Sequence, residues 1–574
     1  MTKGKIILIL IIIGFIVYFN GLFNSFVWDD EEQVVNNVLV HSITNIPSFF
    51  SGSTFNTGGS GSLGGLYYKP MMSVSYSFIY SIFGSNAFFF HMLQLIIHIT
   101  NTIFVFLIFN YFFKKFKNGQ LISFFLSLIF LIHPINTETV IYIASMQDVL
   151  FFFFGIFALW ITITKKNSFF NLFLISFFVL LSLLSKETGF VFIPIILTYL
   201  LFFKKEKFIS NVIYISLVLF LYSFLRFVVA GIYLNKHGLS PITRISFLER
   251  IYNIPEIIIF YLKTFIYPLK LSIAQHWVIK SINFSEFYLP LFLSIIFFIL
   301  LIILAIYFKS KAKDLFKIYL FFLIWFILGL GLHLQIFPLD MTVAERWFYL
   351  PEIGLLGILG IVVQVFLMEN QSLEVKKIKS ILLILFIFLI LFLSIRTIIR
   401  NTNWKNGLAL YSNDIKITQG SFDMENNLGV ELFRVGKYDE AKIHFENSTK
   451  IAPFWWTNWN NLGVMIEREK DYEKAINYYQ KSIDNGKYYL AYENIAKLLF
   501  IQNKSKEAKE FIEQSLRILP NNSNLWLILS YSEYRLGNKE KALQAAKNAF
   551  ILLPSKQNYN IYSRLKDNLP LEIN

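Results

Sequence analysis

The sequence contains no cysteine among its 574 residues. A chain without cysteine has no disulfide framework, no thiolate metal site and no cysteine nucleophile. It also lacks the glycine-rich loop that cradles nucleotide phosphates, which argues against a nucleotide as substrate. The N-terminus is apolar from Ile6 to Phe19 and no small-residue cleavage site follows. We therefore interpret this stretch as an uncleaved first membrane span.

What the chain has in excess is hydrophobic surface. Hydrophobic residues make up 55% of the sequence, 65 of them are Phe, and the mean hydropathy is +0.55. A water-exposed globular surface does not tolerate this composition, so most of the chain must face lipid. From about Asn401 onward, Lys, Glu, Asn and Asp appear at ordinary soluble frequency. The sequence thus predicts a membrane part followed by a water-facing part.

The membrane part is predicted to contain about eleven spanning helices. A bilayer core needs roughly 20 apolar residues in a helix that closes its own backbone hydrogen bonds. Runs that approach this length lie at 5–20, 87–113, 121–133, 149–164, 168–184, 188–203, 208–234, 287–307, 318–336, 350–368 and 380–398.

Lysine clusters set the predicted orientation. The net charge of +15 would suggest nucleic-acid binding in a soluble protein, but here the lysines lie in short loops between apolar runs. We interpret the clusters as cytoplasmic under the positive-inside rule and predict no nucleic-acid partner. They are Lys3 with Lys5, Lys114 to Lys117, Lys165 with Lys166, Lys204 to Lys207, Lys309 to Lys317 and Lys376 to Lys379.

The stretch 254–271 is apolar but contains Pro255, Glu256, Lys263 and Pro268. If it spanned the membrane, the two later lysine clusters would lie outside. We therefore assign it to the outer interface or to a re-entrant segment. The N-terminus is then cytoplasmic and the C-terminal part extracytoplasmic, although Arg396 and Arg400 at the outer end of the last run argue mildly against this orientation.

The water-facing part repeats itself at about 34 residues, the period of tetratricopeptide repeats. Small residues recur where paired helices approach closely, and aromatic residues fill the gaps between the helices. The two small positions hold Gly429, Gly463, Ala496 and Ser530, and Ala441, Ala475, Ala508 and Ala542; the aromatic position holds Trp459, Tyr492 and Trp526. We predict four repeats at 422–455, 456–488, 489–522 and 523–556.

Two tryptophans stand outside this repeat pattern. Trp455 and Trp456 either pack between repeats or form an aromatic contact for a ligand. Stacked repeats of this type present a concave surface, which suits a protein or peptide partner.

Polar groups that lipid does not explain gather at the predicted outer ends of the apolar runs. They could be solvated helix ends with Trp and Tyr as interfacial anchors. Their joint placement instead favours a functional site, with carboxylates as candidate bases beside cations that could hold a phosphate. The loops contain Trp28-Asp29-Asp30-Glu31-Glu32, His133-Pro134 with Glu138, Asp148, Ser185-Lys186-Glu187 and Glu345-Arg346-Trp347.

The second run carries His91, Gln94, His98 and Asn101 on one helical face. A polar face within lipid must point into the helix bundle. We predict interhelical hydrogen bonds for these four residues, with direct participation in chemistry as the alternative.

The ordered motifs resemble the transmembrane and tetratricopeptide-repeat-containing O-mannosyltransferases, members of the GT-C superfamily. The motifs are Trp28-Asp29-Asp30, Tyr68-Lys69-Pro70, His133-Pro134-x-x-Thr137-Glu138, Ser185-Lys186-Glu187 and Glu345-Arg346-Trp347-x-Tyr349-Leu350-Pro351, followed by the repeats. The chain departs from the family where Lys69 replaces a frequent Arg and where Ser145-Met146-Gln147-Asp148 replaces Gly-Arg-x-Asp.

The resemblance implies inverting transfer of a sugar, mannose in the family, from a polyprenyl-phosphate carrier to a Ser or Thr hydroxyl. By analogy Asp29 or Asp30 is the catalytic base, and Lys186 or Arg346 contacts the lipid phosphate. The predicted donor-binding set is Lys69, His133, Glu138, Asp148, Lys186, Glu187, Glu345 and Arg346. We predict no resident metal, although adjacent carboxylates at Asp29 and Asp30 also suit a divalent cation.

The predicted architecture is all-α. It comprises a GT-C-like transmembrane bundle at 1–400, a linker at 401–421, the repeats at 422–556 and a tail at 557–574. The repeats are expected to recruit a protein acceptor. The Ile, Phe, Asn and Lys-rich composition indicates an AT-rich prokaryotic genome and hence the plasma membrane. A non-catalytic membrane scaffold and a transporter are the alternative functions.

Overall fold

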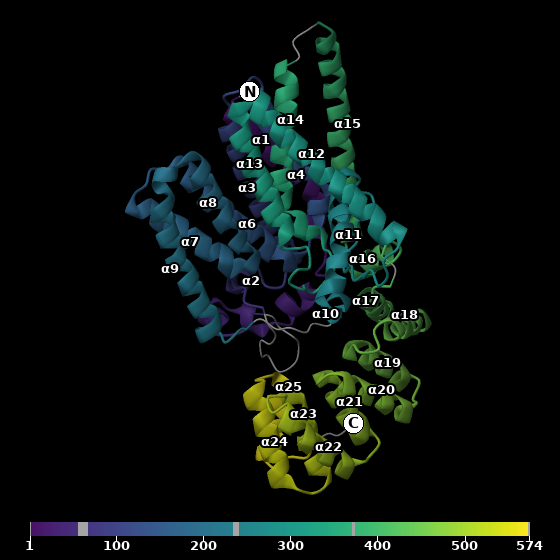
Figure 1. The fold of residues 1–574 in the computed structure, drawn as a ribbon. Helices are drawn as coiled ribbons and strands as arrows, with labels where there is room; N and C mark the ends of the chain where they lie inside the picture. The colour runs from purple at the N-terminus through teal and green to yellow at the C-terminus, as the bar shows by residue number, and fades with distance from the viewer. Residues whose placement is uncertain (1, 55–66, 234–239, 370–372, 419, 572–574) are drawn as a thin grey trace. The chain divides into compact units, whose positions relative to one another are not determined.

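We analysed a computed structural model of the chain, which describes residues 2–54, 67–233, 240–369, 373–418 and 420–571, with the side chains of 368–383 excluded. It divides into two compact units that meet in the sequence at Gln419 and Gly420. Both units are helical, and the described residues contain no β-strand beyond one isolated bridge between Gln275 and Val343. The all-α prediction is therefore confirmed (Figure 1).

The helices of the first unit follow the predicted apolar runs. In chain order they are α1 (Lys3–Tyr18), α2 (Pro70–Phe83), α3 (Ala87–Phe113), α4 (Gly119–Ile132), α5 (Thr137–Ile141), α6 (Met146–Thr164), α7 (Phe169–Ser185), α8 (Phe192–Phe203), α9 (Phe208–Ser223), α10 (Pro241–Arg244), α11 (Phe247–Ile266), α12 (Leu289–Lys311), α13 (Lys313–Gly331), α14 (Pro351–Glu369), α15 (Leu373–Asn403) and α16 (Gly407–Asp414).

Within the described residues, seven helices are long and apolar enough to cross a membrane. An eighth candidate is the pair Gly119–Ile132 and Pro134–Ile141, which is bent by 47°. Shorter apolar helices cover Phe169–Ser185, Glu187–Phe203 and Pro351–Leu367. These helices indicate a multi-pass membrane protein, and each of the eleven predicted runs coincides with one of them; that all eleven cross the bilayer stays a prediction.

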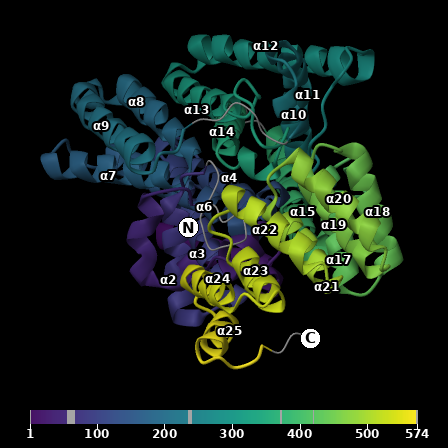
Figure 2. The same cartoon turned by 90° about the horizontal axis from the view of Figure 1, so that it is seen from below.

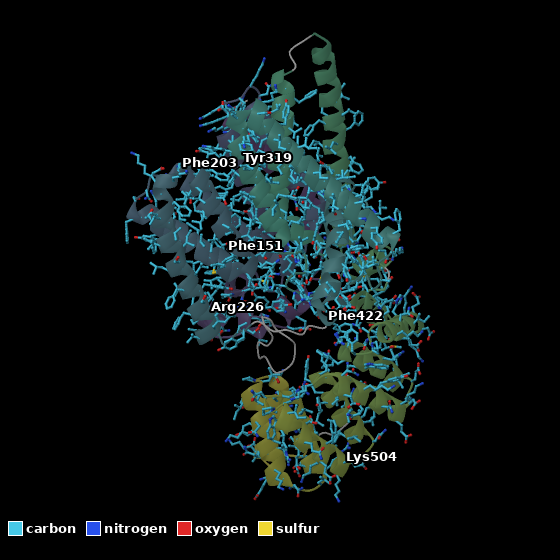
Figure 3. The ribbon with its side chains drawn as sticks, viewed as in Figure 1. Phe151, Phe203, Arg226, Tyr319, Phe422 and Lys504 are labelled. Atoms are coloured by element: carbon cyan, nitrogen blue, oxygen red, sulfur yellow. The ribbon has the colours of Figure 1, made fainter. Side chains whose placement is uncertain are left out.

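Aromatic and glycine residues pack the interior of this unit. Phe203 contacts Phe112 and Phe321 at ring centroid distances of 5.5 and 6.2 Å. Phe203 and Tyr319 lie toward one end of the unit and Phe151 nearer its middle (Figure 3). A Cβ atom at Gly155 would stand 2.0 Å from the Phe192 ring, so this glycine lets α6 and α8 approach closely.

The polar face of α3 forms the predicted interhelical hydrogen bonds. The Gln94 amide donates to the carbonyl oxygens of Thr139 and Tyr142 at 2.6 and 2.7 Å. The His98 Nδ1 atom lies 2.8 Å from the Tyr349 hydroxyl, and the Asn101 amide donates to the Val149 carbonyl at 3.0 Å. These contacts connect α3 to the segments that carry the site.

The charged apolar stretch 254–271 lies largely in α11, which begins with a capping box between Ser246 and Glu249. Pro255 sits inside this helix, and its buried face includes Ile257, Ile258 and Tyr261. The helix is amphipathic and is not among the candidate spans found in the described residues. Its placement at the outer interface or as a re-entrant segment stays a prediction.

The second unit stacks helix pairs that coincide with the four predicted repeats (Figure 2). The pairs are α17 (Phe422–Arg434) with α18 (Tyr438–Ile451), α19 (Trp456–Arg468) with α20 (Tyr472–Asn485), α21 (Tyr489–Ile501) with α22 (Ser505–Ile518), and α23 (Ser523–Arg535) with α24 (Lys539–Leu552). The small positions act as predicted, because a Cβ atom at Gly429 or Gly463 would lie within 2.7 Å of the Phe445 or Tyr479 ring.

The two extra tryptophans pack within the stack. Trp455 meets the Phe422 ring edge-on at 4.9 Å, and a Cβ atom at Gly486 would stand 2.2 Å from Trp456. Both contacts lie within a single repeat, so they favour a packing role over a ligand contact, while packing between repeats stays a prediction.

Two segments are more ordered than the sequence suggests. The region 401–421, predicted as a linker, contains α16, whose Asp414 is fully buried and pairs with Arg400. The predicted tail holds α25 (Lys556–Lys566), which packs on α24. Both segments bury apolar side chains or paired charges. Their polar composition does not indicate this, which is why the sequence predicts a linker and a tail.

Candidate active site

One polar cavity of about 460 Å³, a volume that includes its opening to solvent, lies in the first unit. Three of the predicted site residues line it: Asp29, Lys69 and Arg346. They come from the loop after α1, the N-terminus of α2 and the segment before α14. Its other lining residues are Gln33, Thr54, Tyr67, Met72, Tyr142, Ala144, Gln147 and Asp340.

Asp29 presents its carboxylate to this cavity from a constrained loop. The preceding Trp28 has a φ of 54°, in the left-handed region that non-glycine residues rarely adopt. Its indole stacks on the Tyr142 ring at 5.4 Å and 15°. Burial raises the pKa of Asp29 to about 6, while a hydrogen bond from Tyr142 and the nearby Arg346 lower it. A carboxylate with this pKa suits a general base near neutral pH.

Asp30, the other predicted base, points elsewhere. Its side chain is fully buried and accepts hydrogen bonds from the Val27 amide at 3.1 Å and the Ala144 amide at 2.7 Å. Both carboxylate oxygens are thus engaged by backbone N–H groups. Asp30 fixes the loop that carries Asp29 and does not line the cavity.

Two cations line the same cavity as Asp29. The Lys69 ammonium lies 4.2 Å from the centre of the Tyr67 ring, and in the described part of the chain it forms no ion pair. Burial lowers the pKa of Lys69 to about 8, partly offset by the charge of Glu187. Arg346 is 8% exposed and pairs with the fully buried Glu138. This set of groups can hold an anion beside a base.

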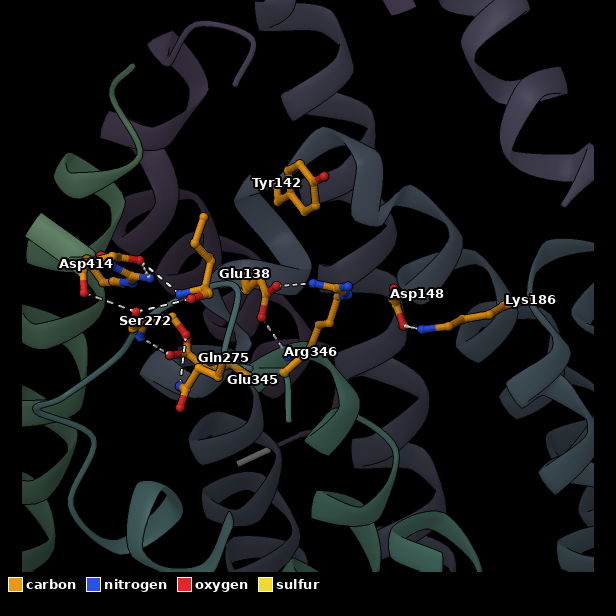
Figure 4. Close-up of polar contacts among 12 residues, drawn as sticks. Glu138, Tyr142, Asp148, Lys186, Ser272, Gln275, Glu345, Arg346 and Asp414 are labelled. Atoms are coloured by element: carbon orange, nitrogen blue, oxygen red, sulfur yellow. Dashed lines mark hydrogen bonds and ion pairs between the residues drawn. The ribbon is translucent and has the colours of Figure 1, made fainter. Parts of the chain in front are cut away.

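Four other charged residues of the predicted set, Glu138, Asp148, Lys186 and Glu187, form ion pairs. Figure 4 shows the first three of them. Glu138 accepts from the Arg346 guanidinium and from the Arg346 backbone amide at 3.1 Å. Lys186 pairs with Asp148 at 2.5 Å. Glu187 pairs with Arg226 at 2.6 Å. Arg226 was not among the residues predicted from the sequence.

Glu345 belongs to a second buried cluster. Its Oε1 atom accepts from the Ser272 amide at 2.5 Å, while Oε2 is buried with no hydrogen-bond partner. Arg400 holds Asp414 through two contacts of 2.6 and 2.9 Å, and Asp414 also accepts from the Ile273 amide. Burial raises the pKa of Glu345 well above its usual range. Glu345 thus positions the loop at 272 and does not line the cavity.

His133 also lies away from the cavity lining. Its Nε2 atom lies 2.9 Å from the Phe265 carbonyl oxygen, and Nδ1 accepts from the Ile135 amide at 3.2 Å. The imidazole therefore joins the break after α4 to α11. This is a structural position, and the predicted contact with a donor has no geometric support here.

Sequence reasoning missed several lining residues, of which Asp340 is the most distinctive. The Tyr67 hydroxyl donates to its carboxylate at 3.2 Å, and its charge acts on both Asp29 and Lys69. The available signal was a second carboxylate between the same two apolar runs, five residues before Glu345. Gln147 was noted only as part of a departure from the family motif, and it too lines the cavity.

The adjacent carboxylates of Asp29 and Asp30 do not form a chelating pair, because backbone N–H groups engage both oxygens of Asp30. Over the described ranges, no group of three or more His, Asp or Glu side chains could hold a metal ion. The residues present therefore do not fit a cation bridged by this pair.

Comparison with known proteins agrees with both parts of the chain. The tetratricopeptide-repeat family model matches residues 457–485 and 489–522. A protein O-mannosyl-transferase of Caenorhabditis elegans is 25% identical over 463 residues, which cover 78% of this chain and 63% of that protein. Protein O-mannosyl-transferase TMTC3 of Homo sapiens is 24% identical over 486 residues, which cover 78% of this chain and 51% of that protein. The chain thus spans between about half and two thirds of the length of these relatives.

Proposed function

Because this chain resembles the transmembrane and tetratricopeptide-repeat-containing O-mannosyltransferases over 78% of its length, we propose that it is a membrane glycosyltransferase. It transfers a sugar, mannose by analogy, from a polyprenyl-phosphate donor to Ser or Thr hydroxyls of proteins. The observation that carries the proposal is the cavity that Asp29, Lys69 and Arg346 line together. Transfer takes place on the extracytoplasmic face of a prokaryotic plasma membrane, where the repeats recruit the acceptor.

In the proposed reaction the acceptor hydroxyl oxygen forms a bond to the sugar C1 atom while the bond from C1 to the phosphate oxygen breaks. Asp29 takes the hydroxyl proton as this bond forms. Lys69 and Arg346 hold the departing lipid phosphate, whose negative charge grows in the transition state. A base and a phosphate site on opposite sides of the sugar give inversion at C1.

Behind these groups, the paired charges keep the cavity walls fixed. Glu138 holds the Arg346 guanidinium in place, and the Trp28 and Tyr142 stack fixes the loop of Asp29. Because the catalytic groups are held before the donor arrives, little reorganisation is needed during transfer.

The test is sugar transfer by the purified full chain in lipid nanodiscs, with a polyprenyl-phosphate mannose donor and a Ser- and Thr-containing peptide. Asp29→Asn keeps the size of the side chain but cannot accept the proton, so transfer falls by about 10²–10⁴. Lys69→Gln raises the KM for the donor and also lowers kcat, because it removes a phosphate partner that acts most strongly in the transition state.

Two controls separate chemistry from folding. Glu32→Gln changes a carboxylate in the same loop that accepts a hydrogen bond from the Asn36 amide at 3.1 Å and lies outside the cavity lining, and it keeps near-normal transfer. Asp30→Asn lowers thermal stability, because it disturbs two buried backbone contacts. Near-normal transfer by Asp29→Asn contradicts the mechanism, and absence of any transfer by the native chain favours the membrane scaffold.

A further inference from the structure

A second pocket lies where α6 ends and where α7 and α9 begin. It has a volume of about 200 Å³, which includes its opening to solvent. A liquid water takes about 30 Å³, so the pocket has room for a group of several heavy atoms. α7 packs against both α6 and α9, and the three helices belong to the membrane unit (Figure 1). Six polar side chains line the pocket: Lys165, Lys166, Lys207, Asn167, Asn171 and Asn211.

This pocket is separate from the candidate active site. Asp148 lies in the first turn of α6, and Lys186 directly follows the last residue of α7. The pocket lies at the opposite ends of the same two helices. Of the residues that the structure describes, none lines both the pocket and the cavity of Asp29. A ligand of the pocket is therefore not the sugar donor in its reacting position.

The pocket is positively charged. Lys165 and Lys166 are exposed, and the described residues around them form no ion pair with either ammonium. The Lys207 ammonium donates to the Lys165 carbonyl oxygen at 2.7 Å, and Lys204 donates to the Ile163 carbonyl oxygen at 2.5 Å. These contacts place two further cations at the C-terminus of α6, where the helix dipole is negative. No carboxylate is found among the described residues that line the pocket.

Amide donors complement these cations. The Asn167 amide donates to the Ser210 hydroxyl at 3.0 Å. The Asn171 and Asn211 amides each donate to a backbone carbonyl oxygen just before or at the start of their own helix, at 2.8 Å. Since a primary amide has two N–H groups, one N–H of each amide remains. The pocket thus combines three ammonium groups with three amides that can still donate a hydrogen bond.

This arrangement exceeds what membrane topology requires. A topology signal depends on the number of lysines in a loop and needs neither a pocket nor fixed amide donors. Ammonium and amide donors together match the oxygen atoms of a phosphate group. The pocket also lies at the ends of two helices whose outer surfaces are apolar. Exposed side chains on α7 and α9 include Phe173, Phe177, Ile213 and Leu217. A phosphate that is attached to acyl chains fits both surroundings.

We propose that this pocket binds the headgroup of an anionic phospholipid, with the phosphate at the lysines and the acyl chains along the apolar surfaces of α7 and α9. On the predicted topology, this lipid belongs to the cytoplasmic leaflet. Basic pockets between membrane helices on that side suit anionic headgroups. The proposal is independent of the proposed glycosyltransferase activity, because no residue of the Asp29 cavity takes part.

The experiment is native mass spectrometry of the purified full chain in detergent, titrated with phosphatidylglycerol. Phosphatidylcholine with the same acyl chains has no net charge, and its first molecule binds about tenfold more weakly or worse. Glycerol 3-phosphate lacks acyl chains and binds at least about 100-fold more weakly. Equal binding of phosphatidylcholine would show an apolar contact only, and equal binding of glycerol 3-phosphate would identify a soluble phosphate as the ligand. Either result overturns the proposal.

Protein variants provide the second arm. Lys165→Gln with Lys166→Gln removes two exposed cations and weakens phosphatidylglycerol binding about 10- to 30-fold. Asn167→Ala removes an amide donor without changing the charge and weakens binding about 2- to 10-fold.

The matched control is Lys114→Gln with Lys115→Gln, two adjacent exposed lysines in another loop that is predicted to be cytoplasmic. It changes the net charge by the same amount and keeps binding within about threefold. Circular dichroism shows whether each variant keeps its helices. Equal weakening by the two lysine pairs would show that binding follows net charge and not this pocket. That result overturns the proposal, as does unchanged binding in both pocket variants.

Discussion

The two units treat charge in opposite ways. In the membrane unit, cations are buried against carboxylates, as in Arg400 with Asp414, where neither side chain is exposed. In the repeat unit, ion pairs such as Lys437 with Glu440 lie at the surface, with more than half of each side chain exposed. An unpaired charge is costly in lipid but well solvated in water. Buried pairs such as Arg400 with Asp414 therefore stabilise the fold of the membrane unit, whereas exposed pairs such as Lys437 with Glu440 add little to the stability of the repeat unit.

Some charges of the membrane unit have no counterion. The buried carboxylates of Asp30 and Glu345 accept hydrogen bonds from backbone N–H groups instead. Asp29 and Lys69 line the cavity, and in the part of the chain that the structure describes neither forms an ion pair. Nearby, Lys186 with Asp148 and Arg346 with Glu138 form ion pairs. This contrast is what the proposed function explains, because charges without a counterion in a cavity are candidates for contact with a substrate.

The largest expected effect comes from breaking a buried pair. Arg400→Ala leaves the Asp414 carboxylate buried without its cation, and the free energy of unfolding falls by about 3–5 kcal/mol. The measurement is denaturant unfolding of the purified chain in detergent, followed by tryptophan fluorescence. Lys437→Ala, which breaks the exposed pair with Glu440, is the control and changes stability by less than about 1 kcal/mol. Equal losses of unfolding free energy in the two variants would show that buried and exposed pairs contribute alike to stability.

A smaller effect concerns packing, which the two units share. Gly463→Ala places a Cβ atom 2.6 Å from the Tyr479 ring. Overpacking costs about 1–3 kcal/mol and exceeds the gain of at most about 1 kcal/mol from the helix preference of alanine. Thermal unfolding followed by circular dichroism should show this loss. Gly331→Ala in α13, where a Cβ atom meets nothing within 4 Å, should be neutral or slightly stabilising.

The third prediction tests the Asp29 carboxylate, which lines the cavity without a counterion. Protonated Asp29 cannot accept a proton, so transfer should decline as pH falls through about 6. Tyr142→Phe removes a donor that stabilises the ionised carboxylate, which raises the pKa of Asp29 and moves the acid limb to higher pH by about one unit or less. The pH profile of transfer measures the shift. An unmoved limb would show that Tyr142 does not act on the base.

The raised pKa of Asp29 makes the protein less stable as pH rises, whereas a carboxylate in an ion pair makes it more stable. Folded Asp29 holds its proton up to about pH 6, whereas an unfolded Asp releases it near about 3.9. Its contribution to stability is thus present below pH of about 4 and lost as pH rises through about 6. Asp29→Asn should flatten this part of the stability profile.

The smallest expected effect is at an exposed pair between repeats. Lys442 lies 2.6 Å from Glu469, with the two side chains 31% and 46% exposed. A double-mutant cycle with Lys442→Ala and Glu469→Ala should give a coupling free energy of about 0–1 kcal/mol that disappears at high salt. A coupling above about 2 kcal/mol would mean that the repeats also depend on ion pairs.

The fold was predictable where its signal is local. Apolar runs and the small positions of the repeats depend on neighbouring residues, and both appear in the structure where the sequence predicts them. The boundary between the two units was harder to predict. The sequence becomes more polar after Asn401, but α16 still packs on the membrane unit. Asp414 looks like a solvated loop residue until its partner Arg400 is known.

The site was predictable only in part, because its geometry depends on distant segments. Asp29 and Asp30 are adjacent, and nothing local says which one faces the cavity. The difference comes from the Ala144 amide, 114 residues away, which holds Asp30. Asp340 reaches Tyr67 across 273 residues and belongs to no motif. The types and order of the residues indicated the chemistry. Which side chains contact one another could be seen only in the folded chain.

The Arg400 and Asp414 pair also determines where the chain can be divided. A truncation at residue 400, where the polarity of the sequence changes, removes Asp414 and leaves a guanidinium buried without a counterion. It also removes Trp404, whose ring lies 5.5 Å from that of Tyr142. A truncation after Thr418 keeps α16 and the pair. Only the longer fragment can report on the membrane unit alone, so loss of activity in the shorter one says nothing about the repeats.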